Sequence, residues 1–279
     1  MEQREIGLIA LDLDGTLLDS HKVLSERNYK ALEAAARKGI AIVPTTGRFF
    51  SGMPKAILEL PFLRYAITIN GARVYDARED AVLRQAEMPA ALAVDIMTYL
   101  DGHGVAYDCY QDDWGWMTAD TLAQAESFAP DRYYLDLISR LRTPVPELKA
   151  YIGERGQGVQ KVQAYFREDQ TALRGELLKT LGTRFPDTAV SSASPRNIEI
   201  NSAGASKGKA MLALTAHLGL RQEQTMAFGD GLNDLSMLTM AGIGVAMANA
   251  CPEALAAAPE RTASCDEDGV ALAIERICL

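Results

Sequence analysis

The sequence predicts an α/β protein in which an α+β domain interrupts a parallel sheet. Three observations indicate this fold: short apolar runs that end at polar residues, helical segments between them, and a change of pattern in the middle of the chain. Runs such as Ile6–Leu11 are too short for helices and are typical of buried parallel strands. Strands that alternate with helices form a sheet with helices on its faces. We therefore expect a doubly wound core and a separate inserted domain.

The first third of the chain alternates strand and helix signals. Ser25 is a typical helix N-cap and Gly39 a typical stop, so a helix is expected between them. The Asn70-Gly71 pair between apolar segments favours a tight hairpin. The expected strands are 6–11, 40–43 and 65–69 in one parallel sheet, followed by hairpin strands at 72–75 and 81–84.

From about Ala86 the pattern changes, because strands now follow one another through tight turns. Such strands pair in an antiparallel sheet that helices cover. The expected elements are helices at 89–100, from about 119 and at 168–181, and strands at 105–110, 159–166, 188–192 and 197–201. The segment Ser202-Ala203-Gly204 is expected to link this domain to the next.

The last part of the chain returns to the first pattern. It predicts helices at 206–218, 233–241, 252–258 and 268–277, and strands at 225–228 and 243–247. Residues 1–85 and 203–279 are therefore expected to form a doubly wound, Rossmann-like core, and residues 86–202 an inserted α+β domain. The length of 279 residues fits two domains.

The composition is that of an ordinary globular protein, with 48% apolar and 23% charged residues. Lys and Arg number 28 against 37 Asp and Glu, which gives a formal net charge of −9. Nucleic acids and anionic membranes attract proteins through Lys and Arg, so neither is an expected partner. No segment approaches the ~20 apolar residues that span a bilayer, and no apolar signal core precedes Ile6. We expect a cytoplasmic protein.

The cysteines and histidines lack the spacing of a metal site. The four cysteines are scattered, and the three histidines lie far apart, so a zinc site is not expected. We interpret the cysteines as small hydrophobic residues in a reducing compartment.

Aspartates gather where two expected strands end. Asp12 and Asp14 follow the first strand, and Asp230 and Asp234 follow the strand 225–228. Ligands of an open parallel sheet bind beyond the carboxyl ends of its strands, so the two pairs would share a crevice if their strands are neighbours. Converging carboxylates repel one another unless a cation lies between them, and Mg²⁺ prefers such oxygen ligands.

Groups that bind phosphate occupy matching places. Thr46 and Gly47 follow the second strand and offer a hydroxyl and an accessible backbone N–H. Lys207 lies at the start of an expected helix, and Asn233 lies between the two late aspartates. Carboxylates, a lysine, a hydroxyl and a metal together are what phosphoryl transfer requires.

At these positions the chain resembles the haloacid-dehalogenase-like hydrolases. The resemblance is carried in order by Asp12–Leu18 (DLDGTLL), Thr46–Arg48 (TGR), Lys207-Gly208 and Gly229–Asp234 (GDGLND). Asn70–Ala72, Asn197–Ile200 and the insertion itself further resemble the Cof-type sugar-phosphatase branch of that family. The resemblance implies that the inserted domain is a type II (IIB) cap.

The resemblance also implies a role for each matched residue. Asp12 would be the nucleophile, and Asp14 the general acid and base. Thr46, Gly47, Lys207 and Asn233 would bind the phosphoryl group, and Mg²⁺ would be held by Asp12, the backbone carbonyl of Asp14, Asp230 and Asp234. Because Asp14 has to carry a proton during part of the cycle, we expect its like-charged neighbour and closure of the cap to raise its pKa.

We therefore expect a Mg²⁺-dependent phosphatase that hydrolyses a small phosphorylated metabolite through an aspartyl-phosphate intermediate. The expected substrate is a sugar phosphate. Two alternatives remain open at this point. A phosphomutase on the same scaffold would move phosphate between hydroxyls of one sugar. A non-catalytic protein would use the crevice only to sense a phosphorylated ligand.

Overall fold

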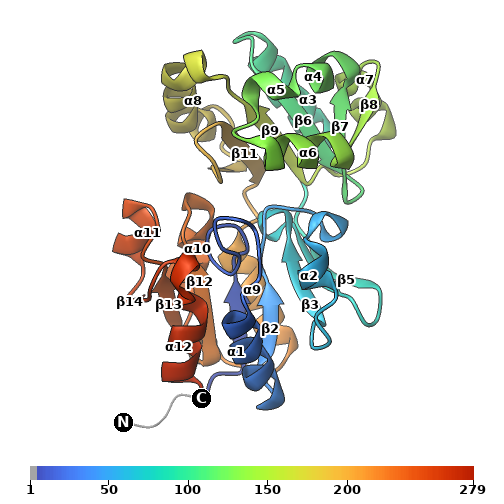
Figure 1. Cartoon of the computed structure of the whole chain (residues 1–279). Helices are drawn as coiled ribbons and strands as arrows, with labels where there is room; N and C mark the ends of the chain where they lie inside the picture. The colour runs from blue at the N-terminus through green and yellow to red at the C-terminus, as the bar shows by residue number, and fades with distance from the viewer. Residues whose placement is uncertain (1–4) are drawn as a thin grey trace. The chain divides into compact units, whose positions relative to one another are not determined.

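The computed structural model describes residues 5–279. The chain forms two compact units (Figure 1). The core unit comprises the chain up to Gln85 together with Ser206–Leu279, and the inserted unit comprises Ala86–Ala205. The segment Ser202-Ala203-Gly204, expected to be a linker, therefore belongs to the inserted unit.

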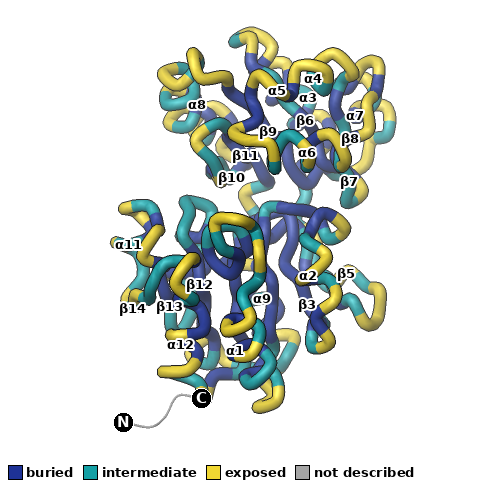
Figure 2. The backbone as a smooth tube through the Cα atoms, viewed as in Figure 1, coloured by how far each residue is buried: buried dark blue, intermediate teal, exposed yellow. Residues whose placement is uncertain are grey.

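The core unit contains a parallel sheet with the strand order β14-β13-β12-β1-β2. Its strands are β1 (Leu8–Leu11), β2 (Ala41–Pro44), β12 (Thr225–Gly229), β13 (Ile243–Ala246) and β14 (Glu260–Arg261). All residues of β1 and β12 are buried, and Figure 2 shows the central strands in dark blue. Burial on both faces explains why these strands are continuous apolar runs.

Helices cover both faces of this sheet. On one face α1 (Glu26–Arg37) and α12 (Gly269–Ile277) pack with Ile9 and Leu11 of β1. On the other face α9 (Lys207–His217) and α10 (Leu235–Met240) pack with Leu8 and Ala10. The remaining helices of the unit are α2 (Lys55–Leu58) and α11 (Pro252–Ala257). The Ser25 hydroxyl accepts a bond from the Asn28 backbone N–H, which confirms the expected N-cap of α1.

A second, antiparallel sheet in the core unit consists of β3 (Tyr65–Thr68), β4 (Arg73–Asp76) and β5 (Ala81–Gln85). The predicted hairpin is thus confirmed. The expectation that β3 extends the parallel sheet is met only in part: β3 lies beside β2 and parallel to it through the bridge between Thr45 and Ile67, but its regular ladder is with β4. Pro44, which ends β2, has no N–H to continue a ladder.

The inserted unit contains a sheet with the strand order β10-β11-β9-β6-β7-β8. Its strands are β6 (Ala106–Gln111), β7 (Trp114–Thr118), β8 (Arg142–Val145), β9 (Lys161–Tyr165), β10 (Thr188–Ser191) and β11 (Asn197–Ser202). Neighbours run antiparallel except for β7 and β8. This is the predicted α+β arrangement.

Two groups of helices pack on this sheet. α3 (Ala90–Asp101), α7 (Leu148–Arg155) and α8 (Thr171–Arg184) share one apolar cluster with β6, β9 and β11. α4 (Ala119–Ala123), α5 (Ala125–Phe128) and α6 (Arg132–Leu141) share a smaller cluster with Met117 and Tyr165. No helix in the described part of the chain combines the length and apolar character that a membrane crossing requires.

Several elements were not predicted from the sequence: β7, β8, α6, α7 and β14. β8 contains Pro144, which argues against a central strand, but β8 is an edge strand and pairs on one side only. α7 buries only Leu148 and Ile152, too few residues to produce a clear helical period. β14 has only two residues.

Candidate active site

Carboxylates from two neighbouring strands meet at the carboxyl edge of the core sheet. β1 and β12 pair in parallel, Asp12 directly follows β1, and Asp230 directly follows β12. One carboxylate oxygen from each of Asp12, Asp230 and Asp234 lies within 4.8 Å of the other two. The sequence predicts that the two pairs of aspartates meet if their strands are neighbours, and β1 and β12 are neighbours.

Lys207 lies between two of these carboxylates. It is the first residue of α9 and is completely buried. Its Nζ donates to Asp12 Oδ1 at 2.5 Å and to Asp234 Oδ1 at 2.6 Å. Burial opposes ionisation of Lys207, but the two carboxylates raise its pKa. Burial and the neighbouring Asp234 and Asp230 raise the pKa of Asp12, although Lys207 opposes them.

The loop after β12 fixes the other two carboxylates. Asp234 Oδ2 accepts the backbone N–H groups of Asp230 and Gly231, both at 2.9 Å. Thr16 Oγ1 donates to Asp230 Oδ1 at 2.8 Å. Burial and the charge of Asp234 raise the pKa of Asp230 to about 7, against the bond from Thr16. A further cation beside Lys207 would favour the ionised state of the whole cluster.

Asp14 is held by two cations. Arg48 donates from Nη2 to Asp14 Oδ1 at 2.7 Å and from Nε to Oδ2 at 2.9 Å, and Lys22 Nζ lies 3.1 Å from Oδ1. Burial would raise the pKa of Asp14, but Arg48 and Lys22 outweigh it and lower the pKa. The expectation of a raised pKa is therefore wrong for this state of the site. The expectation rested on a like-charged neighbour and on closure of the cap, and it did not include the two cations that contact Asp14.

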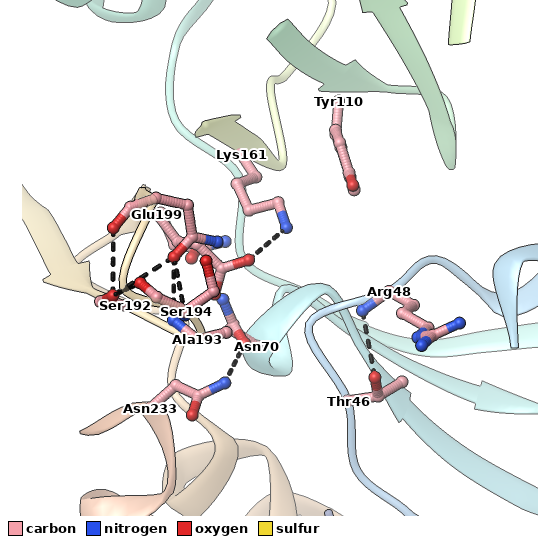
Figure 3. A network of polar contacts seen from close by, with 12 residues as sticks. Thr46, Arg48, Asn70, Tyr110, Lys161, Ser192, Ala193, Ser194, Glu199 and Asn233 are labelled. Atoms are coloured by element: carbon pink, nitrogen blue, oxygen red, sulfur yellow. Dashed lines mark hydrogen bonds and ion pairs between the residues drawn. The ribbon is translucent and has the colours of Figure 1, made fainter. Parts of the chain in front are cut away.

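The loop after β2 carries the expected phosphate-binding residues. Thr46 is buried, and its Oγ1 accepts the backbone N–H of Arg48 at 3.2 Å (Figure 3). Gly47 is the residue between them. The side chain of Asn233 donates from Nδ2 to Asn70 Oδ1 at 3.3 Å, also seen in Figure 3. The loop after β2, with Thr46 and Gly47, and the loop after β12, with Asn233, both follow the carboxyl ends of core strands, as the sequence predicts.

The backbone places Asn70 at this edge through an uncommon conformation. Ile69, Asn70 and Gly71 all have positive φ, with values of 51°, 58° and 91°. Asn and Gly tolerate this region, whereas a β-branched residue rarely adopts it. The Asn70 backbone N–H donates to the Thr46 carbonyl at 2.9 Å, so this turn is tied to the Thr46 loop.

Four residues of the site were not assigned a role from the sequence: Thr16, Lys22, Arg48 and Asn70. Thr16, Arg48 and Asn70 stand inside the matched motifs, so their positions carried a usable signal. Lys22 had none, because an isolated lysine is most often a solvated surface residue.

The donor set of the cluster suits a hard divalent cation. The groups that gather here are all carboxylate oxygens, which Mg²⁺ prefers. Within the described residues, four carboxylates (Asp12, Asp14, Asp230 and Asp234) stand against three cations (Lys22, Arg48 and Lys207). A bound divalent ion would turn this excess of negative charge into an excess of positive charge, which attracts a phosphate.

Comparisons with known proteins agree with this geometry. Residues 9–274 match the family model of the haloacid dehalogenase-like hydrolases. The phosphatase YwpJ of Bacillus subtilis is 31% identical over 95% of this chain and 97% of its own. The 5-amino-6-(5-phospho-D-ribitylamino)uracil phosphatase YcsE of Bacillus subtilis is 29% identical over 98% and 96%. The solved structure of the subclass IIB sugar phosphatase BT4131 superposes with a TM-score of 0.79 at 25% identity, covering 96% of this chain and 98% of that one.

Proposed function

This chain belongs to the haloacid dehalogenase-like hydrolase family, and we propose that it is a Mg²⁺-dependent phosphatase of small phosphorylated metabolites. The observation that carries the proposal is the buried contact of Lys207 with Asp12 and Asp234, with Asp230 beside them. A reactive carboxylate, a fixed cation and a set of metal-binding oxygens occur there together. These are the groups that phosphoryl transfer uses for positioning and charge neutralisation.

In the first step a carboxylate oxygen of Asp12 attacks the phosphorus of the substrate. The new bond joins Asp12 to phosphorus, and the bond from phosphorus to the substrate oxygen breaks. Asp14 gives that oxygen its proton, so the dephosphorylated alcohol leaves neutral. Lys207, the Thr46 hydroxyl, the Gly47 N–H and Asn233 hold the phosphoryl oxygens during the transfer.

In the second step a water molecule attacks the phosphorus of the aspartyl phosphate. Asp14 takes a proton from this water, inorganic phosphate leaves, and the Asp12 carboxylate is restored. Asp14 therefore alternates between its two protonation states. Arg48 and Lys22 favour its ionised state in the free protein, and a phosphate dianion that attracts both cations would relieve that preference.

Asp12, the backbone carbonyl of Asp14, Asp230 and Asp234 would hold Mg²⁺. When bound, the ion supplies charge neutralisation to the phosphoryl group. It also relieves the mutual repulsion of the carboxylates, which explains why a cluster with a raised Asp230 pKa is retained at this edge.

We further propose a sugar phosphate as the substrate class. The similarity to a subclass IIB sugar phosphatase and to a phosphatase named for a phosphoribityl compound supports this proposal. Both names describe phosphorylated polyhydroxy compounds. The presence of Asp12, Asp14 and Lys207 together supports catalysis over mere sensing of a phosphorylated ligand.

The test is release of inorganic phosphate from a panel of sugar phosphates and nucleotides, with Mg²⁺ and with EDTA. Asp12→Asn keeps the shape of the side chain but removes the nucleophile, so phosphate release should fall by at least about 10⁴-fold. Asp80→Asn is the matched control, because Asp80 is an exposed residue with positive φ in the β4–β5 turn, where Asn is equally tolerated. Retained turnover in Asp12→Asn would refute the assignment of the nucleophile.

A further inference from the structure

A third loop at the carboxyl edge of the core sheet contacts both segments that carry the carboxylates. It consists of residues 247–251, between β13 and α11, and we call it the brace loop. Because β13 pairs in parallel with β12, this loop leaves the sheet at the same edge as the loop after β12. None of its residues belongs to the matched motifs.

The brace loop holds the Asp230 segment through its backbone. The Met247 N–H donates to the Gly229 carbonyl at 3.2 Å, and the Cys251 N–H donates to the Asp230 carbonyl at 2.8 Å. These two bonds fix the peptide groups on either side of Asp230. The position of the Asp230 side chain thus depends on the brace loop.

The brace loop holds the Asp12–Asp14 turn through one side chain. Asn249 Nδ2 donates to the Gly15 carbonyl at 2.8 Å. The Oδ1 atom of the same amide accepts the Cys265 backbone N–H at 2.9 Å. Both ends of the Asn249 amide are therefore used, and its orientation is fixed by a donor on one side and an acceptor on the other.

Gly15 lies against Asp230 of the other carboxylate segment. It has a φ of 85°, and a Cβ built on it would lie 2.6 Å from Asp230 Oδ2. Only glycine allows the turn to approach Asp230 this closely. The carbonyl that Asn249 holds belongs to Gly15, one peptide after the Asp14 carbonyl. Asn249 therefore restrains the turn at the residue that lies against Asp230.

We propose that Asn249 is a positioning residue for the metal site: it sets the spacing between the Asp12–Asp14 turn and Asp230, and thereby the affinity for Mg²⁺. This inference rests on the proposed function, which places Mg²⁺ among these residues. In the described part of the chain, the bonds of the Asn249 side chain go to the Gly15 carbonyl and the Cys265 N–H, so it acts through the backbone. Residues that orient metal ligands from outside the coordination shell typically change metal affinity by 10-fold to 100-fold when they are replaced.

A purely structural role for Asn249 is the competing explanation. In that case its function would be to anchor the turn at Cys265, and the bond to Gly15 would not matter. The two roles differ in the bond on which they depend. Asn249→Asp keeps an oxygen that accepts the Cys265 N–H but removes the N–H that donates to Gly15. The added negative charge would by itself strengthen Mg²⁺ binding, so weaker binding in this variant points to the lost bond.

The experiment is calorimetric titration of the full chain with Mg²⁺ alone, without substrate. Asn249→Ala should bind Mg²⁺ at least about tenfold more weakly than the wild type. Asn249→Asp should also bind more weakly, despite its added charge. Ser264→Ala is the matched control. It removes the bond from Ser264 Oγ to Glu267 next to Cys265, but it keeps the Asn249 side chain and the Cys265 N–H. It should bind Mg²⁺ like the wild type.

Thermal unfolding in EDTA verifies that each variant is folded. Wild-type affinity in a folded Asn249→Ala would overturn the inference, and so would an equal loss in Ser264→Ala. If Asn249→Ala does not fold, the result with Asn249→Asp decides. A wild type that binds no Mg²⁺ would instead overturn the metal site of the proposed function, so the two failures are distinguishable.

Discussion

Each unit of the molecule buries a lysine against carboxylates, and the two cases differ in one respect. In the core unit Lys207 is fully buried and donates to two carboxylates, Asp12 and Asp234. In the inserted unit Lys161 of β9 is 1% exposed and donates to Glu199 of β11 at 2.7 Å (Figure 3). The Lys161 ammonium also lies 4.2 Å from the centre of the Tyr110 ring.

The difference lies in charge balance rather than in burial. Lys161 and Glu199 neutralise each other, and the ring of Tyr110 adds a cation–π contact. Lys207 leaves its surroundings negative, because Asp230 also lies beside its two partners. A buried ion pair is therefore not by itself a sign of a functional site. A surplus of buried carboxylates without matching cations is such a sign, because the cluster is stable only with a further cation.

Replacing the two lysines by methionine tests this comparison with the largest expected effect. Removal of either lysine takes a buried cation away from its carboxylate partner, which costs about 3–5 kcal/mol of unfolding free energy. Lys207→Met should in addition reduce phosphate release by about 10²-fold to 10³-fold, since one donor to the phosphoryl group is lost. Lys161→Met should leave Mg²⁺ affinity unchanged. Chemical denaturation, phosphate release and Mg²⁺ titration give the three readouts.

A second set of replacements distinguishes a buried pair whose charges are balanced from a cluster with an excess of carboxylates. In the double variant Lys161→Met, Glu199→Leu, both charges are gone, and stability should return to the wild-type level or above it. Apolar replacement of Lys207 together with Asp234 should restore no activity, because the site needs those charges. A Lys161 variant that loses Mg²⁺ affinity would contradict the comparison.

The sequence was informative for the core unit because its chemistry follows short continuous motifs. Asp12, Lys207, Asp230 and Asp234 could be predicted to meet because each follows an apolar strand or begins a helix. The parallel pairing of β1 with β12 then brings them together. Local sequence thus determines the site as soon as the strand order is right.

The inserted unit and the state of Asp14 were harder to predict, for a common reason. Lys161 and Glu199 lie on different strands, and nothing in either strand marks the other as its partner. Likewise, Arg48 and Lys22 approach Asp14 from separate segments, so the direction of its pKa could not be read from its own motif. Contacts between distant side chains depend on packing, which short-range patterns do not encode.

Addition of Mg²⁺ should stabilise one unit and not the other. At a free concentration 100 times the dissociation constant, an ion that binds only the folded state adds about 2.7 kcal/mol. Amide hydrogen exchange in β1 and β12 should therefore slow by about 100-fold when exchange requires unfolding of the core unit. Exchange in β9 and β11 should not change. Equal protection of both units would show that they unfold together. The two units would then differ in the chemistry of their buried lysines but not in stability.

The smallest expected effect compares two helix caps. Ser206 Oγ accepts the Lys209 N–H at 3.1 Å at the start of α9, and Thr118 Oγ1 accepts the Thr121 N–H at 3.1 Å at the start of α4. Ser206→Ala and Thr118→Ala should each cost about 1 kcal/mol, measured by chemical denaturation. Phosphate release by Ser206→Ala should stay within a few-fold of the wild type, because Asp12 and Asp234 hold the Lys207 ammonium directly. A loss as large as that of Lys207→Met would mean that the cap, and not the carboxylates, positions this lysine.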